Sequence, residues 1–121
     1  MATSSRQDVR NFLLEVKDII TSNPGWQTWD IVPREKNKDF IAELGFIYAD
    51  VRNAILDLSV REYCEGPIED FGQPGYFWVF GKMIAGKEAY IKLKVARIGN
   101  LKKVRVVSFH EADQPLCYPF K

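Results

Sequence analysis

The stretch FWVFGKMIAGKEAYIKLKVARIGNLKKVRVVSFH, residues 77–110, decides the fold of this 121-residue chain. Apolar and polar residues alternate over much of its length, which is typical of strands with one buried face. Gly86 and the pair Gly99-Asn100 stand where hairpin turns need a positive φ. The segment therefore predicts a three-stranded antiparallel meander, with strands at Phe77–Ile84, Glu88–Ile98 and Lys102–Phe109.

The residues before this meander predict helices. In the first helix one apolar stripe recurs at helical spacing; its members are Val9, Phe12, Leu13, Val16, Ile19 and Ile20. Ser4 or Ser5 can cap its start, because a polar Gln7 or Asp8 follows three residues later. Asn23-Pro24-Gly25 should end the helix, since proline cannot continue it.

Shorter elements are expected between the first helix and the meander. They are a strand at Trp29–Val32, a helix at Lys38–Leu44 with Gly45 as its left-handed cap, and a helix at Tyr48–Leu58. Tyr63–Gly75 holds three glycines and two prolines, so we expect a long loop there. The tail after His110 looks irregular.

This order of elements predicts an α+β fold, with N-terminal helices packed on one face of a twisted antiparallel sheet. We expect a single domain over residues 1–121, mostly helical over 1–58 and ending in the 77–110 meander. The net charge of +1 gives no sign of a nucleic-acid partner. Cys64 and Cys117 lack metal-site spacing, and no secretory or membrane segment is visible, so we expect a cytoplasmic protein.

The second strand of the meander has two different faces. Its apolar face consists of Ala89, Ile91, Leu93 and Val95. Tyr90, Lys92 and Lys94 point the other way, and Lys82 and Lys87 add charge nearby. A tyrosine in line with lysines can hold an RNA backbone. Alternation alone favours the solvated face of an ordinary antiparallel sheet.

His110, the only histidine, ends the third strand, and imidazole suits acid–base work near neutral pH. Its side is open at this point, because Val104 and Val106 differ in parity from Phe109. A bulge near Val106, or burial of both faces, would reconcile them.

Three acids of the expected loop, Glu65, Glu69 and Asp70, are compatible with a divalent cation or with a plain exposed acidic loop. No phosphate loop, zinc-protease helix or nucleophile elbow is present in the sequence.

Five short runs, taken in order, resemble the MqsR family of type II toxins, within the RelE-like mRNA interferase superfamily. They are Tyr63-Cys64-Glu65-Gly66-Pro67, Trp78-Val79-Phe80-Gly81-Lys82, Tyr90-Ile91-Lys92-Leu93, Val107-Ser108-Phe109-His110 and Tyr118-Pro119-Phe120. The likeness covers residues 58–121. It implies a RelE-like fold and an endoribonuclease that needs no metal or other cofactor. It also implies a cognate antitoxin and an mRNA substrate, free or on the ribosome.

The resemblance carries over residue by residue. The family's strand tyrosine matches Tyr90, and the lysine that follows its Ser-Phe pair is replaced here by His110. The family's loop lysine falls near Glu65, which reverses the charge. In the resulting hypothesis Tyr90, His110 and Glu65 are catalytic. The RNA-binding residues are Tyr63, Lys82, Lys92 and Lys94, with Lys82 and Lys92 on the scissile phosphate.

Two rival interpretations fit the same sequence. One is a non-catalytic module of toxin-like fold that only binds an antitoxin or RNA, which the near-neutral net charge favours slightly. The other is a metal-dependent nuclease that uses Glu65, Glu69 and Asp70.

Overall fold

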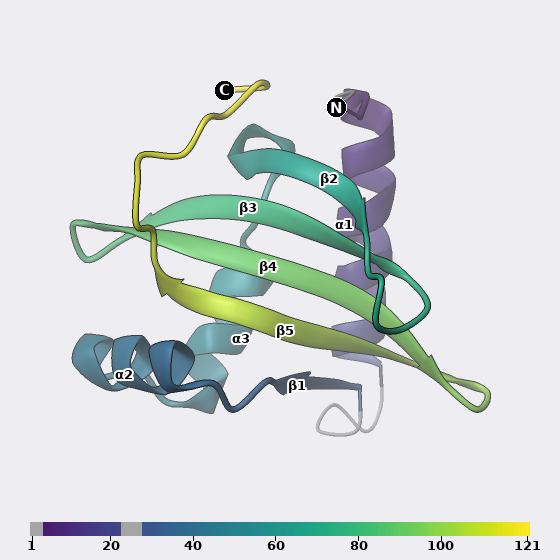
Figure 1. Cartoon of the computed structure of the whole chain (residues 1–121), viewed down its shortest axis with the longest axis horizontal. Helices are drawn as coiled ribbons and strands as arrows, with labels where there is room; N and C mark the ends of the chain where they lie inside the picture. Colours follow the sequence, from purple (N-terminus) through teal and green to yellow (C-terminus); the bar gives the residue numbers. More distant parts are fainter. Residues whose placement is uncertain (1–3, 23–27) are drawn as a thin grey trace.

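The computed structural model describes residues 4–22 and 28–121 of the chain. Its elements are α1 (Arg6–Thr21), β1 (Trp29–Ile31), α2 (Glu35–Leu44), α3 (Tyr48–Leu56), a short 3-10 helix η2 (Val60–Glu62), β2 (Tyr63–Glu69), β3 (Tyr76–Ile84), β4 (Lys87–Ile98) and β5 (Leu101–Glu111). The strands form one open sheet in the order β1-β5-β4-β3-β2. In Figure 1 the sheet lies in front of α1 and α3, so these helices cover a single face.

The predicted meander is confirmed. β3, β4 and β5 pair antiparallel, with Gly81 opposite Tyr90 and Tyr90 opposite His110. Gly86 and Gly99 have φ values of 79° and 62°, as the two hairpin turns require. The class is therefore α+β, with helices on one face of a mostly antiparallel sheet.

The helices begin and end largely where the sequence indicates. Ser5 caps α1 through a reciprocal pair of bonds with Asp8, which confirms one of the two expected caps. Gly45 ends α2 in the left-handed conformation. α3 is two residues shorter than expected, although Leu58 beyond its end is still fully buried. The expected stop at Asn23-Pro24-Gly25 lies outside the described residues.

Two expectations about the sheet are wrong. Tyr63–Glu69 is not loop but the edge strand β2, paired antiparallel with β3 through two register shifts. An edge strand tolerates proline and glycine, because its outer backbone groups need no ladder partner. The sheet is also mixed, since β1 runs parallel to β5.

The core lies between the helices and the inner face of the sheet. We use "inner face" for the side that α1 and α3 cover and "outer face" for the other. Fully buried Ile91 and Leu93 of β4 meet Val9 and Val16 of α1 in one apolar cluster. Val95, expected to complete the buried set, is only half-buried.

A β-bulge in β5 settles the side on which His110 lies. Ser108 pairs with Lys92, whereas the next register pair is Val106 with Leu93, so Val107 is the extra residue. Of the two alternatives that would reconcile these positions, the structure shows the bulge near Val106. It lets Val104, Val106 and Phe109 all be fully buried, and it leaves His110 on the outer face beside Tyr90.

Asn37 of α2 replaces β1 as the partner of β5 where β1 ends. Its side-chain amide donates to the carbonyls of Val32 and Val107, at 2.9 and 3.1 Å, and its oxygen accepts from the amide of Phe109 at 2.9 Å. The side chain is 1% exposed. This contact brings the start of α2 against the C-terminal part of β5.

Candidate functional site

Tyr90 and His110 form a stacked pair on the outer face. They occupy directly paired positions of β4 and β5, and their ring centroids are 5.3 Å apart with 17° between the planes. The sheet register therefore holds the two side chains that the sequence singled out for proton transfer within reach of a single bound group.

An open cavity of about 610 Å³ surrounds this pair. Its floor is the outer face of β4 and β5, through Tyr90, Lys92, Ser108 and His110. One wall is the start of α2, and another is the tail segment 113–116. A volume of this size is ample for a nucleotide-sized ligand.

Two cations of this cavity have no acidic partner among the described residues. Lys92 extends over the ring of Phe77, with its Nζ 4.5 Å from the ring centroid. Arg34, the residue that precedes α2, donates from Nη1 to Ser108 Oγ at 3.4 Å. Because neither is neutralised by a carboxylate, both are suited to bind a phosphate.

Arg34 is a site residue that the sequence analysis did not identify. It lies 76 positions before His110 in the chain and carries no motif of its own. Only the fold brings it to β5, through the β1–β5 pairing and the bonds from Asn37. The same holds for Lys36, which lines the cavity and pairs with Asp113 at 3.5 Å.

The contact of His110 with the backbone determines which ring nitrogen is free. Its Nδ1 is 3.0 Å from the carbonyl oxygen of Glu111. A carbonyl can only accept, so this contact places the hydrogen on Nδ1 and leaves the lone pair on Nε2. In the neutral imidazole, Nε2 is then the nitrogen that can accept a proton.

Tyr90 is held in its neutral form. Burial raises the pKa of its phenol above the ordinary value of 10.0, and the nearby carboxylate of Glu65 raises it further, against a smaller opposing effect of Arg34. A phenol with a raised pKa acts at neutral pH as a hydrogen-bond and proton donor. His110 and Tyr90 thus offer an acceptor and a donor side by side.

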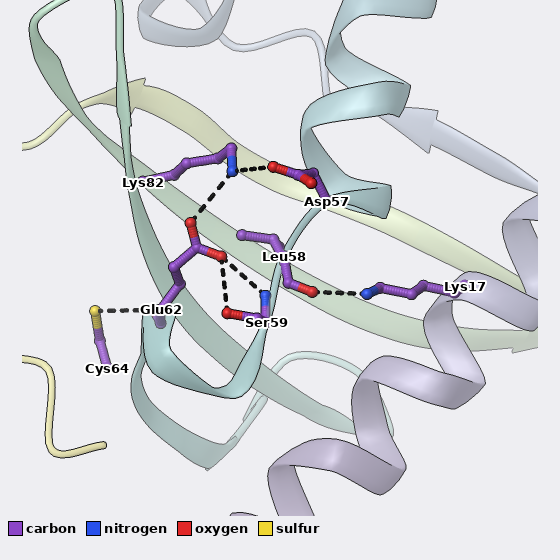
Figure 2. A network of polar contacts seen from close by, with 7 residues as sticks. All are labelled: Lys17, Asp57, Leu58, Ser59, Glu62, Cys64 and Lys82. Carbon is purple, nitrogen blue, oxygen red and sulfur yellow. Dashed lines mark hydrogen bonds and ion pairs between the residues drawn. The ribbon is translucent and has the colours of Figure 1, made fainter. Parts of the chain in front are cut away.

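Lys82 does not belong to this site, which corrects the expectation that it shares a phosphate with Lys92. Lys82 pairs in register with Ala89 of the inner face, whereas Lys92 is on the outer face. Figure 2 shows its ammonium between Asp57 and Glu62, at 2.7 and 3.2 Å. Its hydrogen bond lowers the pKa of Asp57, and the role of Lys82 is to tie β3 to the segment after α3.

Tyr63 and Lys94 are also unavailable as RNA contacts. Tyr63 is fully buried, and its hydroxyl donates to the carbonyl of Gly66 at 2.6 Å. Lys94 is on the outer face but only 5% exposed, because its ammonium binds Asp70 at 2.6 Å and anchors the turn after β2. The expected RNA-binding roles of these two residues are therefore contradicted by their burial.

Glu65 lies near the site without lining it. It lies on β2, where it pairs with Val79 of β3, and its charge acts on Tyr90, but it does not line the cavity. The expected acidic cluster is dispersed, since Asp70 is engaged by Lys94. Within residues 4–22 and 28–121 no group of three or more His, Cys, Asp or Glu side chains could hold a metal ion.

Comparison with known proteins adds no assignment. No family model, no curated protein and no solved structure matches this chain significantly. Of the helices in the part of the chain that the structure describes, none combines the length and the apolar character needed to cross a membrane.

Proposed function

We propose that this chain is an endoribonuclease that cleaves RNA by attack of the ribose 2′-hydroxyl on the adjacent phosphodiester. One observation carries the proposal. The acceptor His110 and the neutral donor Tyr90 are stacked in a cavity that is also lined by Arg34 and Lys92, two cations without a carboxylate partner among the described residues. The resemblance to the MqsR family agrees with this assignment.

The four side chains match the requirements of this reaction. Nε2 of His110 takes the proton of the 2′-hydroxyl, whose oxygen then forms a bond to phosphorus. Arg34 and Lys92 stabilise the negative charge that develops on the phosphate oxygens. As the bond from phosphorus to the 5′-oxygen breaks, Tyr90 donates a proton to that oxygen. The products are a 2′,3′-cyclic phosphate and a 5′-hydroxyl, and the His110 proton restores the phenol through water.

The wider role belongs to the same proposal. An RNA-cutting domain of this kind would act as the toxin of a type II toxin–antitoxin pair, on mRNA in the cytoplasm, with a cognate antitoxin as its partner. Arrest of cell growth on expression, relieved by the product of the adjacent reading frame, is the result expected for such a pair.

Cleavage of a 5′-labelled RNA in EDTA tests the chemistry. The wild-type chain should produce fragments that end in a cyclic phosphate. His110→Ala should slow cleavage by about 100-fold or more, which is the usual contribution of one acid–base group. Tyr90→Phe and Arg34→Ala should each slow it by at least about tenfold. Tyr76→Phe is the matched control, because Tyr76 is 54% exposed and outside the cavity.

Two results would decide against the proposal. Full activity of both His110→Ala and Tyr90→Phe would show that this pair is not catalytic. A wild-type chain that binds RNA or an antitoxin without cutting would instead support the rival interpretation, a non-catalytic module of toxin-like fold.

A further inference from the structure

The C-terminal tail, residues 112–121, is fixed across the outer face of the sheet. The amide of Ala112 donates to the backbone carbonyl of Glu88 at 2.8 Å. The carboxylate of Glu88 then accepts from the Leu116 amide at 3.2 Å and from the Tyr118 hydroxyl at 2.6 Å. In Figure 1 the tail runs from the end of β5 past β4 and β3 toward the start of α1.

Two more contacts seat the tail. Gly81 of β3 leaves room for Tyr118, since a Cβ at this position would lie 2.2 Å from the Tyr118 hydroxyl oxygen. Phe120 stacks on Tyr63 with ring centroids 5.5 Å apart, and the Arg6 guanidinium lies over Phe120. Segment 113–116, which lines the cavity, is therefore anchored to the sheet by contacts at both of its ends and forms an ordered wall of the cavity.

The charges in the cavity are divided between its walls. Arg34 and Lys92 have no carboxylate partner among the described residues, whereas the tail presents the amide of Gln114 and the carboxylate of Asp113, which pairs with Lys36 of α2 at 3.5 Å. A nucleotide is divided in the same way, with an anionic phosphate at one end and a neutral hydrogen-bonding base at the other. A carboxylate repels the phosphate, so the tail wall suits the base.

We infer that the tail is the base-reading wall of the RNA site, and that Asp113 selects a base with an exocyclic amino group over uracil. The inference rests on the proposed function. An ionised carboxylate only accepts hydrogen bonds, so it can bind the 4-amino group of cytosine but meets a second acceptor at the 4-oxygen of uracil. The side chain of Asp113 is 79% exposed and that of Lys36 is 66% exposed, so their ion pair contributes little. Asp113 can therefore leave Lys36 and bind a base.

Binding of two uncleavable oligonucleotides tests this inference. A hexamer of 2′-O-methyl cytidine and one of 2′-O-methyl uridine lack the attacking hydroxyl, so fluorescence anisotropy measures affinity alone. Wild-type protein should bind the cytidine hexamer about tenfold more tightly, as expected for one discriminating contact. Asp113→Asn should lose most of that preference, because an amide can also donate to the 4-oxygen of uracil. Asp18→Asn, the same change on the exposed side of α1, should keep it.

The outcomes separate this inference from the proposed function. Equal binding of both hexamers by the wild-type chain, or an unchanged preference in Asp113→Asn, overturns the base-reading role even if RNA is cleaved normally. A cytidine preference that depends on Asp113 supports it even if the wild-type chain cuts no RNA. Failure to bind either hexamer, together with failure to cut RNA, overturns both.

Discussion

At the scale of single residues, the two cysteines differ in their surroundings. Cys64 is half-buried on β2, whereas Cys117 is exposed on the tail. Burial, reinforced by the charges of Glu88 and Glu65, raises the pKa of the Cys64 thiol to about 12. Because the thiolate is the reactive form, Cys64 should stay unreactive until the pH approaches that value.

Alkylation with iodoacetamide at pH 8, followed by peptide mass spectrometry, measures this difference. We expect fast labelling of Cys117 and labelling of Cys64 slower by at least about tenfold, with the Cys64 rate rising as the pH increases. Cys117→Ser should abolish the fast phase, and Cys64→Ser should leave it unchanged. Equal rates at the two cysteines would show that Cys64 is not shielded.

The sequence predicts which residues are central to the site better than it predicts which residues surround them. Tyr90 and His110 were both singled out, and they proved to be stacked. The side on which His110 lies depends on the bulge at Val107, which the apolar pattern offers only as one of two alternatives. The sequence hypothesis that groups Lys82 with Lys92 is wrong, because the register of the hairpin between β3 and β4 places the two lysines on opposite faces of the sheet. Arg34 was missed because no local pattern links it to β5.

At the scale of elements, Asn37 determines how α2 joins the sheet. The sequence gives no sign of this role, since one asparagine near the start of a helix is ordinarily exposed. Here it satisfies two carbonyls and one amide at the edge of β5, beyond the end of β1. The position of Arg34 against Ser108 depends on the same contact.

Asn37→Ala should therefore be strongly destabilising. The change leaves three backbone groups without their partner in a buried place, which costs roughly 3 kcal/mol of the free energy of unfolding. Urea unfolding followed by circular dichroism measures the loss. Asn53→Ala on the exposed side of α3 is the matched control and should change stability by less than about 0.5 kcal/mol. A similarly small effect at Asn37 would mean that β5 does not need this edge partner.

The β2 strand shows why the sequence pattern predicts a loop where the structure has a strand. Glycine and proline within Tyr63–Glu69 are typical of loops, yet this segment is a paired edge strand. At Gly66, φ is 128° and a Cβ would lie 2.9 Å from the carbonyl oxygen of Phe77, so the residue type is required by the strand itself. The amino-acid composition shows the glycine, but it does not show the backbone conformation and the close contact that require it.

At the scale of the whole molecule, the tail ties the outer face of the sheet to its inner face. It leaves β5, crosses to Glu88 and Gly81, and places Phe120 on Tyr63, a residue of the buried core. The sequence predicted this segment to be irregular, and its lack of helix or strand is confirmed. Its fixed course could not be predicted, since it depends on a glycine in β3 and a glutamate in β4.

Gly81→Ala should release the tail and keep the sheet. The new Cβ would lie 2.2 Å from the Tyr118 hydroxyl oxygen and 2.6 Å from a methyl group of Leu116, so the tail must move. The β3 ladder needs only backbone groups, and circular dichroism should change little. Chymotrypsin should then cut after Leu116, and mass spectrometry should detect the loss of residues 117–121.

The control for this experiment is a glycine without such a neighbour. At Gly72 a Cβ would make only ordinary contact, at 3.5 Å from Asp70, so Gly72→Ala should resist chymotrypsin as the wild type does. If the tail of Gly81→Ala resists chymotrypsin as well as the wild-type tail does, the position of Tyr118 does not depend on the space above Gly81. A released tail should also remove the wall that carries Asp113, so Gly81→Ala should bind the cytidine and uridine hexamers alike. Agreement between the protease and binding results would link the position of the tail to base choice in a variant that keeps the Asp113 side chain.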